Sequence, residues 1–469
     1  MRASVETEKL GVPSSSVICE GFVGQGASTG AGLGMPNVPI AMVPGHVDTK
    51  SKEQLAEDVK TVTLDMIVKQ LTTQPAEAKG PAEPGLKDII FKGTFEEVNK
   101  YFYANKYSDG LPIVPPTVEK VEEFLKFTDR SPDEKISVLL PDNREATVWN
   151  VAVNGVMAGC RPEYMPVLLA LAEAMADPKY GVEHSGNTPG SETLITLNGP
   201  IIKDLGFNYE QGVLRDGIQP NTTVGRFWRL FLRNVAGFLH GTTDKGTYGG
   251  TWKVVEAENE DVEAKIGWQP LSVDMGFKAG DNVVTISRMV GSEIICSIFG
   301  SKPEEMLPFI SDRVANIMGL EMLFTVSPEN ACSNKPHLQL TPVLAETIAK
   351  AGWSKKDVQQ YLFDHARIPA WKAEKLVNDW TNFVAPHQSL CDVVNKTSKI
   401  PKVFCESTDP NRMVPVVCKP DDLLITVTGD PMRTNAQIFG SNGILGYTVS
   451  KPIKLPANWS TLLKEAKGQ

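Results

Sequence analysis

The segment at 154–175, NGVMAGCRPEYMPVLLALAEAM, constrains the fold most strongly, because small residues and one thiol lead directly into an apolar run. Pro162 suits the first turn of a helix, where its missing N–H is no loss. The residues after it place apolar side chains at helical spacing, which predicts a helix packed in a core: Leu168, Leu169, Leu171, Ala172 and Met175.

Cys160 stands at the expected start of that helix, near unpaired backbone N–H groups and the positive end of the helix dipole. This setting favours a thiolate, and the neighbouring Arg161 acts in the same direction. Cys160 is therefore a candidate nucleophile and Arg161 a candidate ligand for an anionic group. The other interpretation is a small, buried and inert core cysteine.

The bulk properties narrow the function classes. A chain of 469 residues exceeds one ordinary domain. Its net charge of −9 argues against nucleic acid as a partner, since no excess of basic residues is present to neutralise phosphates. No window is long and apolar enough for a membrane span, and no signal peptide is visible at the N-terminus. We expect no nucleic-acid and no membrane partner.

The seven cysteines are odd in number, widely spaced and without a CxxC motif. This pattern argues against a disulfide framework and against a closed zinc site. The histidines form no HxH or HExxH cluster, so we expect no metal and no cofactor from local motifs, although a metal site built from distant residues stays open. A reducing, cytoplasmic location follows as the default.

The N-terminal residues alternate strand and helix signals, which is typical of an α/β fold. Residues 12–20 and 38–43 are predicted strands, and 51–71 is a predicted amphipathic helix. The piece is too short for a parallel sheet buried on both faces, so we expect half a module completed elsewhere. The Gly-rich stretch 24–30 resembles a phosphate-binding loop, or is simply a Gly-rich turn.

A linker and a larger domain follow. Residues 75–85 (PAEAKGPAEPG) predict an extended linker, and the capping box at Thr94 opens a helix. Asp109 lies in the turn before two prolines that hold the chain extended, where it is a plain turn residue or a proton carrier in a pocket. The expected division is a partial module, a linker, a main α/β domain, and a helical insertion with a closing strand: 1–74, 75–93, 94–320 and 321–469.

Two polar loops and a turn in the main domain add candidates. His184 lies in a polar loop before a predicted strand at 193–197, and a histidine there is a candidate acid or base, or a structural residue. Asn198 follows that strand in a turn and is a candidate substrate ligand. Tyr248 belongs to a hydroxyl-rich loop suited to a lid or a ligand contact and is a candidate substrate ligand. The acidic run at 256–261 is expected to be solvated.

The segment at 215–235 predicts a helix with three arginines on one face, one of them Arg226. These arginines form either a salt-bridged surface or a clamp for a carboxylate or phosphate. Asn221 at the start of this helix is a candidate cap and substrate ligand. Asp430 follows a predicted strand at 422–427, where open α/β sheets bind ligands.

Several of these pieces resemble one family. The segments NGVMAGCRPEYMPV, YSDGLPIVPPT, TVGRFWRLFLRNV and LLITVTGD resemble the large C-terminal part of UGSC-motif (seleno)proteins over residues 94–469, and residues 7–72 resemble the second half of that family's N-terminal module. That module is similar to selenocysteine subunits of the glycine and proline reductase type. The redox motif expected before the EK-x-G-x-P segment is absent from this sequence, which implies another subunit that supplies it, or a chemistry that relies on Cys160.

Three hypotheses follow. The first is a thiol-dependent enzyme, or enzyme subunit, that acts on a small anionic molecule by reductive cleavage of a carbon–heteroatom bond. In it Cys160 is the nucleophile, Arg161 and Arg226 bind the anion, and His184 or Asp109 moves protons. The second is a non-redox hydrolase or lyase that uses cysteine or acid–base catalysis. The third is a non-catalytic ligand-binding subunit of a heteromeric complex.

Overall fold

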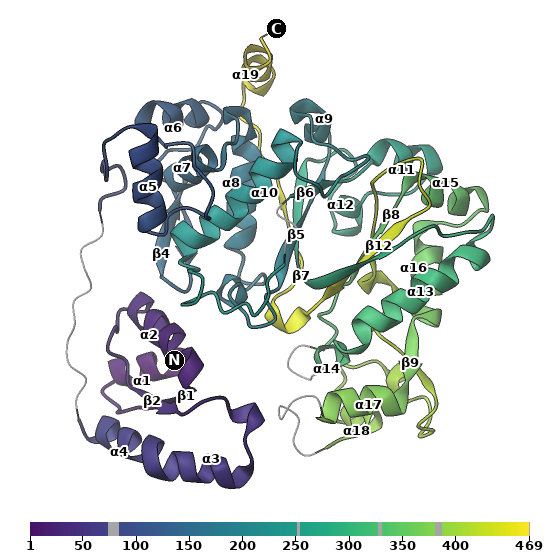
Figure 1. Cartoon of the computed structure of the whole chain (residues 1–469). Coiled ribbons are helices and arrows are strands. Elements are labelled where there is room, and N and C mark those ends of the chain that lie inside the picture. Colours follow the sequence, from purple (N-terminus) through teal and green to yellow (C-terminus); the bar gives the residue numbers. More distant parts are fainter. Residues whose placement is uncertain (74–83, 251–253, 327–330, 380–386, 469) are drawn as a thin grey trace.

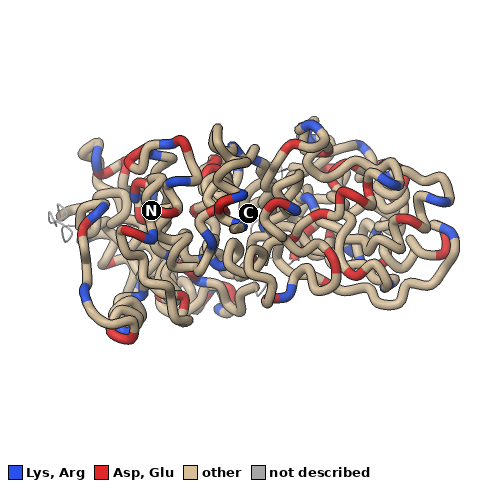
Figure 2. The backbone as a smooth tube through the Cα atoms, turned by 90° about the horizontal axis from the view of Figure 1, so that it is seen from above, with Lys and Arg blue, Asp and Glu red and all other residues tan. Residues whose placement is uncertain are grey.

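The structure is a computed structural model that describes residues 1–73, 84–250, 254–326, 331–379 and 387–468 (Figure 1). Helices and strands of a mixed parallel and antiparallel sheet confirm the expected α/β class. Most of the predicted linker at 75–85 lies outside the described residues. Seen from above, acidic and basic residues are interspersed along the elongated molecule (Figure 2).

The N-terminal module, residues 1–73, contains two parallel strands between helices. The predicted strands and the long helix are confirmed, although the helix is divided by a π-helical turn at Val59–Thr63. The elements in chain order are α1 (Arg2–Lys9), β1 (Ser16–Cys19), α2 (Val23–Gly32), β2 (Ile40–Val43), α3 (Lys52–Asp58) and α4 (Leu64–Thr72). In Figure 1 this module (purple) lies below the first helices of the main domain.

The Gly-rich stretch is a helix, α2, so both predictions for it, a phosphate-binding loop and a Gly-rich turn, are wrong. Glycine, which has no side chain, allows close packing here. A Cβ on Gly26 would lie 2.7 Å from Cδ1 of Ile18 on β1, and a Cβ on Gly30 would overlap the Val38 side chain. Helix α2 therefore packs closely against the module's strands and the chain before β2, as only a helix with a bare face can.

The main domain contains a mixed sheet of seven strands. Its order is β11-β8-β12-β7-β5-β6, with β13 also paired to β7. The long central strand β7 pairs with β5, β12 and β13. The bounds are β5 (Glu192–Asn198), β6 (Val255–Ala257), β7 (Val283–Ile295), β8 (His337–Leu340), β11 (Leu424–Val427), β12 (Ala436–Ser441) and β13 (Val449–Pro452).

The two edge strands of this sheet approach each other. The Asn259 N–H donates to the Val427 carbonyl at 2.7 Å, and the Thr428 hydroxyl donates to the Ala257 carbonyl at 2.9 Å. The sheet is therefore strongly curled, and its inner face encloses a polar network. Glu256 accepts hydrogen bonds there from Thr426 and Thr196, and its carboxylate lies 3.5 Å from the His337 ring.

Two hydrophobic cores cover the outer face. The first packs helices before and after β5, and the second packs the helices between β7 and β11. The helices of the first are α5 (Phe95–Ala104), α6 (Val118–Leu125), α7 (Val148–Ala158), α8 (Met165–Met175), α9 (Ile201–Leu205) and α10 (Gln219–Phe231). Those of the second are α13 (Pro303–Gly319), α14 (Met322–Thr325), α15 (Pro342–Lys350), α16 (Lys355–His365), α17 (Ala370–Asp379) and α18 (Leu390–Lys396).

Smaller elements complete the domain. They are β3 (Lys135–Leu139) paired with β4 (Arg144–Thr147), β9 (Arg367–Pro369) paired with β10 (Met413–Pro415), and the helices α11 (Glu260–Ile266), α12 (Leu271–Asp274) and α19 (Trp459–Ala466). The strand expected to close the domain, β11, is followed by two more strands. One of them, β12, is central because it pairs with both β7 and β8.

Two disulfides overturn the expectation that the cysteines form none. Cys332 is joined to Cys418, and Cys391 to Cys405. The first pair is 86 residues apart in sequence, so wide spacing did not exclude a bridge once the fold had brought the residues together. Cys19, Cys160 and Cys296 are free thiols. Among the described residues, none of the helices combines the length and apolar character required to cross a bilayer.

Candidate functional site

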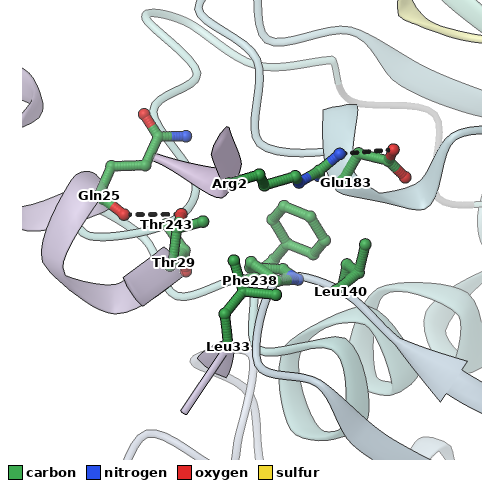
Figure 3. Close-up of a pocket in the computed structure, with 9 residues that line it drawn as sticks. Arg2, Gln25, Thr29, Leu33, Leu140, Glu183, Phe238 and Thr243 are labelled. Atoms are coloured by element: carbon green, nitrogen blue, oxygen red, sulfur yellow. Dashed lines mark hydrogen bonds and ion pairs between the residues drawn. The ribbon is translucent and has the colours of Figure 1, made fainter. Parts of the chain in front are cut away.

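A small cavity opens where the N-terminal module meets the main domain. It has a volume of about 40 Å³, room for a few waters or a small ion, because one water needs about 10–15 Å³. We call it the module–domain cavity; it is lined by Arg2, Gln25, Thr29, Leu33, Leu140, Pro141, Glu183, Phe238 and Thr243 (Figure 3). Arg2, Gln25, Thr29 and Leu33 come from α1, α2 and the residue that caps α2.

Glycine again permits the close approach that builds this cavity. A Cβ on Gly32 would overlap the Pro141 carbonyl oxygen, so the end of α2 touches the main domain through bare backbone. The Lys245 ammonium lies 5.7 Å from the centroid of the Phe22 ring, a cation–π contact between the two parts. The cavity therefore belongs to a close contact between module and domain.

Arg2 and Glu183 form an ion pair across the cavity, with Nη1 and Oε1 3.1 Å apart (Figure 3). Burial raises the pKa of Glu183, but a hydrogen bond from its own backbone N–H and the charge of Arg2 outweigh that effect and leave the pKa lowered. The Arg2 side chain keeps about half of its surface, 49%, exposed, so a ligand can reach the guanidinium.

His184 is exposed beside this pair. Partial loss of its water shell lowers the pKa of the imidazole, the nearby Glu183 charge opposes that, and the charges of Arg288 and Arg2 add to the lowering. The ring is therefore neutral at pH 7 and able to accept a proton. Arg288 is buried, donates to the Ser185 hydroxyl at 2.9 Å, and lies over the Tyr180 ring at 4.4 Å.

The predicted arginine face of α10 is salt-bridged. Arg226 donates two hydrogen bonds to the Asp109 carboxylate, at 2.9 and 3.0 Å, and a third to the Pro112 carbonyl at 2.9 Å. Arg229 pairs with Asp244 at 3.1 Å and with Glu192 at 3.5 Å. The Arg226–Asp109 pair therefore fixes the turn before the two prolines.

Cys160 ends helix α7. Its backbone N–H donates to the Gly155 carbonyl at 3.0 Å while Gly159, at φ +81°, donates to Val156; this is the Schellman arrangement of a helix C-terminus. The thiol is buried, and desolvation raises its pKa to about 12, against the lowering effect of a Thr223 hydrogen bond and the Arg226 charge. The expected thiolate is not favoured, because burial penalises the charged form of the thiol.

The other predicted binding residues have partners of their own. Arg161 pairs with Glu163 at 2.6 Å and donates to the Ala466 carbonyl at 3.0 Å. Asn221 lies inside α10, which begins at Gln219, and its amide group bonds the backbone of Asn208 and Val255. These contacts join elements of the main domain.

The remaining candidates are Asn198, Tyr248 and Asp430. Asn198 donates to Glu258 at 2.6 Å and to Glu260 at 2.9 Å in a buried cluster. Tyr248 is 96% exposed. Asp430 accepts a hydrogen bond from the Met432 N–H in its own turn, at 2.8 Å. The structure brings Asp109, Cys160 and Arg226 together. It places His184 next to Glu183, which lines the module–domain cavity, but His184 is not itself a lining residue.

A cluster of buried charged side chains was not predicted from the sequence. The acidic run at 256–261 was expected to be solvated, yet Glu256 and Glu258 are buried, and Lys355 of α16 pairs with Glu263 at 3.1 Å. Burial and the Glu258 charge raise the pKa of Glu263 well above its usual range. Local sequence could not predict this cluster, because Lys355 is about ninety residues from Glu263 in the chain. No group of three or more His, Cys, Asp or Glu in the described residues is arranged to bind a metal.

Comparison with known protein families finds a match for the first part of the chain. Residues 1–73 match the model of the UGSC family. No curated protein and no solved structure matches the chain. The match covers the module that contributes Arg2, Gln25 and Thr29 to the cavity.

Proposed function

Residues 1–73 are a UGSC-family segment, and from this premise we propose that the protein is an enzyme that binds a small carboxylate in the module–domain cavity and acts on it by non-redox acid–base chemistry, as a lyase or hydrolase. The observation that carries the proposal is the Arg2–Glu183 pair, formed between the module and the main domain beside His184.

Anion binding is the first step. A planar carboxylate pairs well with a guanidinium, and Arg2 is half exposed with Glu183 as its present partner. The Gln25 side-chain amide lines the same cavity and can donate to the ligand, whereas the Thr29 and Thr243 hydroxyls donate to the carbonyls of Gln25 and Gly237. Leu140 and Phe238 contribute an apolar wall that excludes water from one side of the ligand.

Proton transfer is the second step. When a substrate carboxylate binds the Arg2 guanidinium, Glu183 loses its ion-pair partner. Burial then raises the pKa of the Glu183 carboxyl group. The base formed in this way appears only when substrate is bound. His184, neutral at pH 7, accepts or returns the proton beside it.

The test uses proton exchange, which needs no knowledge of the leaving group. We expect the full chain to exchange the α-hydrogens of acetate, a carboxylate small enough for this cavity, in deuterium oxide. Glu183→Gln and His184→Gln should each lower the exchange rate by about a hundredfold or more. Cys160→Ala is the matched control and should keep the rate. Equal rates in all four proteins would contradict the proposal, whereas binding without exchange would favour the ligand-binding subunit.

The second candidate is the thiol-dependent reductive enzyme, favoured by the Thr223 hydroxyl and the Arg226 charge beside the Cys160 sulfur. It requires opening of the site, since the buried thiol has a raised pKa. Loss of turnover in Cys160→Ser, with stimulation by an added dithiol, would support it over acid–base chemistry.

A further part of the proposal concerns partners and location. The outer face of the module exposes apolar side chains, with 55% of Val17, 47% of Leu64 and 53% of Val68 accessible. We propose that another polypeptide covers this face in a cytoplasmic complex. Val68→Lys should leave the chain folded and abolish the larger species in sedimentation of the natively isolated protein; an unchanged sedimentation coefficient would contradict this.

A further inference from the structure

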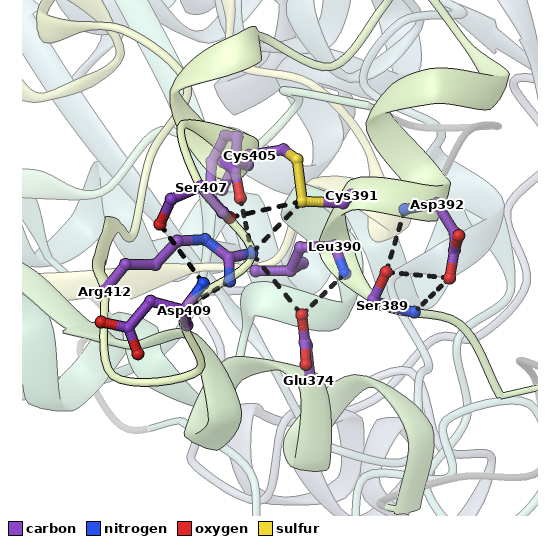
Figure 4. Close-up of a disulfide and its surroundings, with 10 residues drawn as sticks. Glu374, Ser389, Leu390, Cys391, Asp392, Cys405, Ser407, Asp409 and Arg412 are labelled. Carbon is purple, nitrogen blue, oxygen red and sulfur yellow. Dashed lines mark hydrogen bonds and ion pairs between the residues drawn. A yellow bond between two sulfur atoms is a disulfide. The ribbon is translucent and has the colours of Figure 1, made fainter.

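The Cys391–Cys405 disulfide lies in a polar setting, at the base of the second helical core (Figure 4). Both sulfur-bearing residues are partly exposed. Cys391 belongs to α18, and Cys405 ends a short 3₁₀ helix at Lys402–Cys405. A small thiol can therefore reach the bond from solvent. In the other disulfide, Cys418 is only 6% exposed.

A fixed guanidinium faces one of the two sulfurs. Nη2 of Arg412 lies 3.8 Å from the Cys391 sulfur. The same guanidinium is held by the carbonyls of Phe404, at 3.1 Å, and Asp409, at 2.9 Å, and it lies 3.6 Å from Glu374. The arginine side chain is only 11% exposed, so its charge is poorly screened and its position does not depend on the disulfide.

The remaining contacts of this disulfide with residues that the structure describes do not supply a second cation. The Cys391 sulfur lies 3.6 Å from the Ser407 carbonyl oxygen, and Asp392 is occupied in the capping box with Ser389. Glu374 shares the guanidinium and weakens its field. Arg412 nevertheless distinguishes the two sulfurs, because it contacts Cys391. An arginine beside a sulfur lowers the pKa of the corresponding thiol and makes that sulfur the better leaving group.

We propose that Cys391 and Cys405 form a redox-active dithiol/disulfide site whose substrate is an external dithiol, small or protein-borne. One thiolate of the dithiol attacks the Cys405 sulfur, the Cys391–Cys405 bond breaks, and Cys391 leaves as a thiolate paired with Arg412. The second thiol of the dithiol, as thiolate, then attacks the mixed disulfide and releases Cys405, which takes up a proton. Two electrons pass from the dithiol, which becomes a disulfide, to the protein.

The Cys332–Cys418 disulfide serves as the internal control in the same molecule. The Cys332 sulfur faces the Lys399 backbone carbonyl at 3.5 Å, a group that does not stabilise a thiolate, and Cys418 is buried. We therefore expect this disulfide to resist a reductant that opens the Cys391–Cys405 bond.

The experiment follows reduction of the full chain by dithiothreitol at pH 7, with alkylation at timed intervals and mass spectrometry of the two peptide pairs. Cys391–Cys405 should be reduced at least about tenfold faster than Cys332–Cys418. Arg412→Gln should slow only that reduction, by at least about threefold, because one pKa unit of leaving-group stabilisation is lost. Arg412→Lys retains the charge and should recover part of the rate.

A second measurement fixes the direction of attack. In the Cys391→Ser and Cys405→Ser variants the remaining cysteine is free, and the pH at which its alkylation rate is half-maximal gives its pKa. Cys391 should show the lower value, and Arg412→Gln should raise it. Equal reduction rates of the two disulfides, or a rate unaffected by Arg412→Gln in a protein with native circular dichroism, would overturn the proposal. The test does not involve the module–domain cavity.

Discussion

The backbone N–H of Cys160 donates to the carbonyl of Gly155, 3.0 Å away, so this cysteine ends α7 instead of beginning α8. A residue beyond a helix C-terminus lies near carbonyl groups and the negative end of the dipole, which does not favour a thiolate. Burial adds to this effect. The sulfur that the sequence marked as a nucleophile is therefore held protonated.

The reactivity of Cys160 follows from this setting. With its pKa raised to about 12 by burial, the native thiol should react with iodoacetamide at pH 8 at least about a hundredfold more slowly than the exposed Cys296 in the same chain. Mass spectrometry of timed alkylation measures both rates. Comparable rates would mean that Cys160 opens to solvent and would revive the thiol-dependent candidate.

The Arg226–Asp109 pair should be important for stability, because Asp109 is largely buried and the contact is bidentate. Arg226→Ala leaves that carboxylate without its cation and should lower the free energy of unfolding by about 3 kcal/mol. Arg226→Lys keeps the charge but loses the bidentate contact, and should lower the free energy of unfolding by about 1–2 kcal/mol. Denaturant unfolding measures both values.

The matched control for this pair is Arg313→Ala. Arg313 is half exposed and lies 3.8 Å from Glu293, so its removal should change stability by less than about 0.5 kcal/mol. A loss in Arg226→Ala no larger than in this control would show that the buried pair is dispensable.

Glu321 should make stability depend on pH. Burial raises its pKa to about 7, against the lowering effect of its hydrogen bond from Asn442. The native state then holds a proton that the unfolded state releases near pH 4.3, so this group's contribution to stability falls as pH rises from about 4.3 to 7 and stays constant above that.

Glu321→Gln removes that dependence and keeps an acceptor for Asn442. It should raise the free energy of unfolding at pH 8 by about 2–3 kcal/mol and change it little at pH 4. Glu122→Gln, at an exposed position, is the control and should have no effect at either pH. An equal change at both pH values would indicate a packing effect instead of a titration.

Gly32 should set the contact between module and main domain. Gly32→Ala places a methyl group on the Pro141 carbonyl and should displace α2, which weakens the Arg2–Glu183 pair. Hydrogen exchange of α2 should rise, while that of β5 and β7 stays unchanged. Gly24→Ala on the same helix meets nothing within 4 Å and is the control. Unchanged protection of α2 in Gly32→Ala would contradict the close approach.

Local signals predicted much of the fold. The capping box at Thr94 forms as expected, and the apolar spacing after Pro162 gives a fully packed helix. These features depend on residues within one or two turns. The prediction for the Gly-rich stretch was wrong because glycine permits both a tight turn and a close helix contact. The close contact here is with the Ile18 and Val38 side chains, which the local pattern does not reveal.

The candidate site was less predictable, because its residues meet only through the tertiary fold. Arg2 and Glu183 are separated by 181 positions, and no local pattern indicates that they pair. His184 was singled out from its polar loop, but the guanidinium groups that adjust its pKa come from Arg2 and Arg288. Likewise Lys355 meets Glu263 only because α16 packs beside the residues that follow β6.

Acetate binding, followed through the imidazole resonances of the six histidines in proton NMR, tests the central claim most directly. His184→Gln identifies the resonance. We expect acetate to shift the His184 signal in the wild-type chain and in Cys160→Ala. We expect Arg2→Gln to weaken acetate binding by at least about tenfold, the effect of one lost charge-assisted hydrogen bond. A His184 signal unmoved by acetate, or moved equally in Arg2→Gln, would contradict the assignment of the module–domain cavity as the functional site.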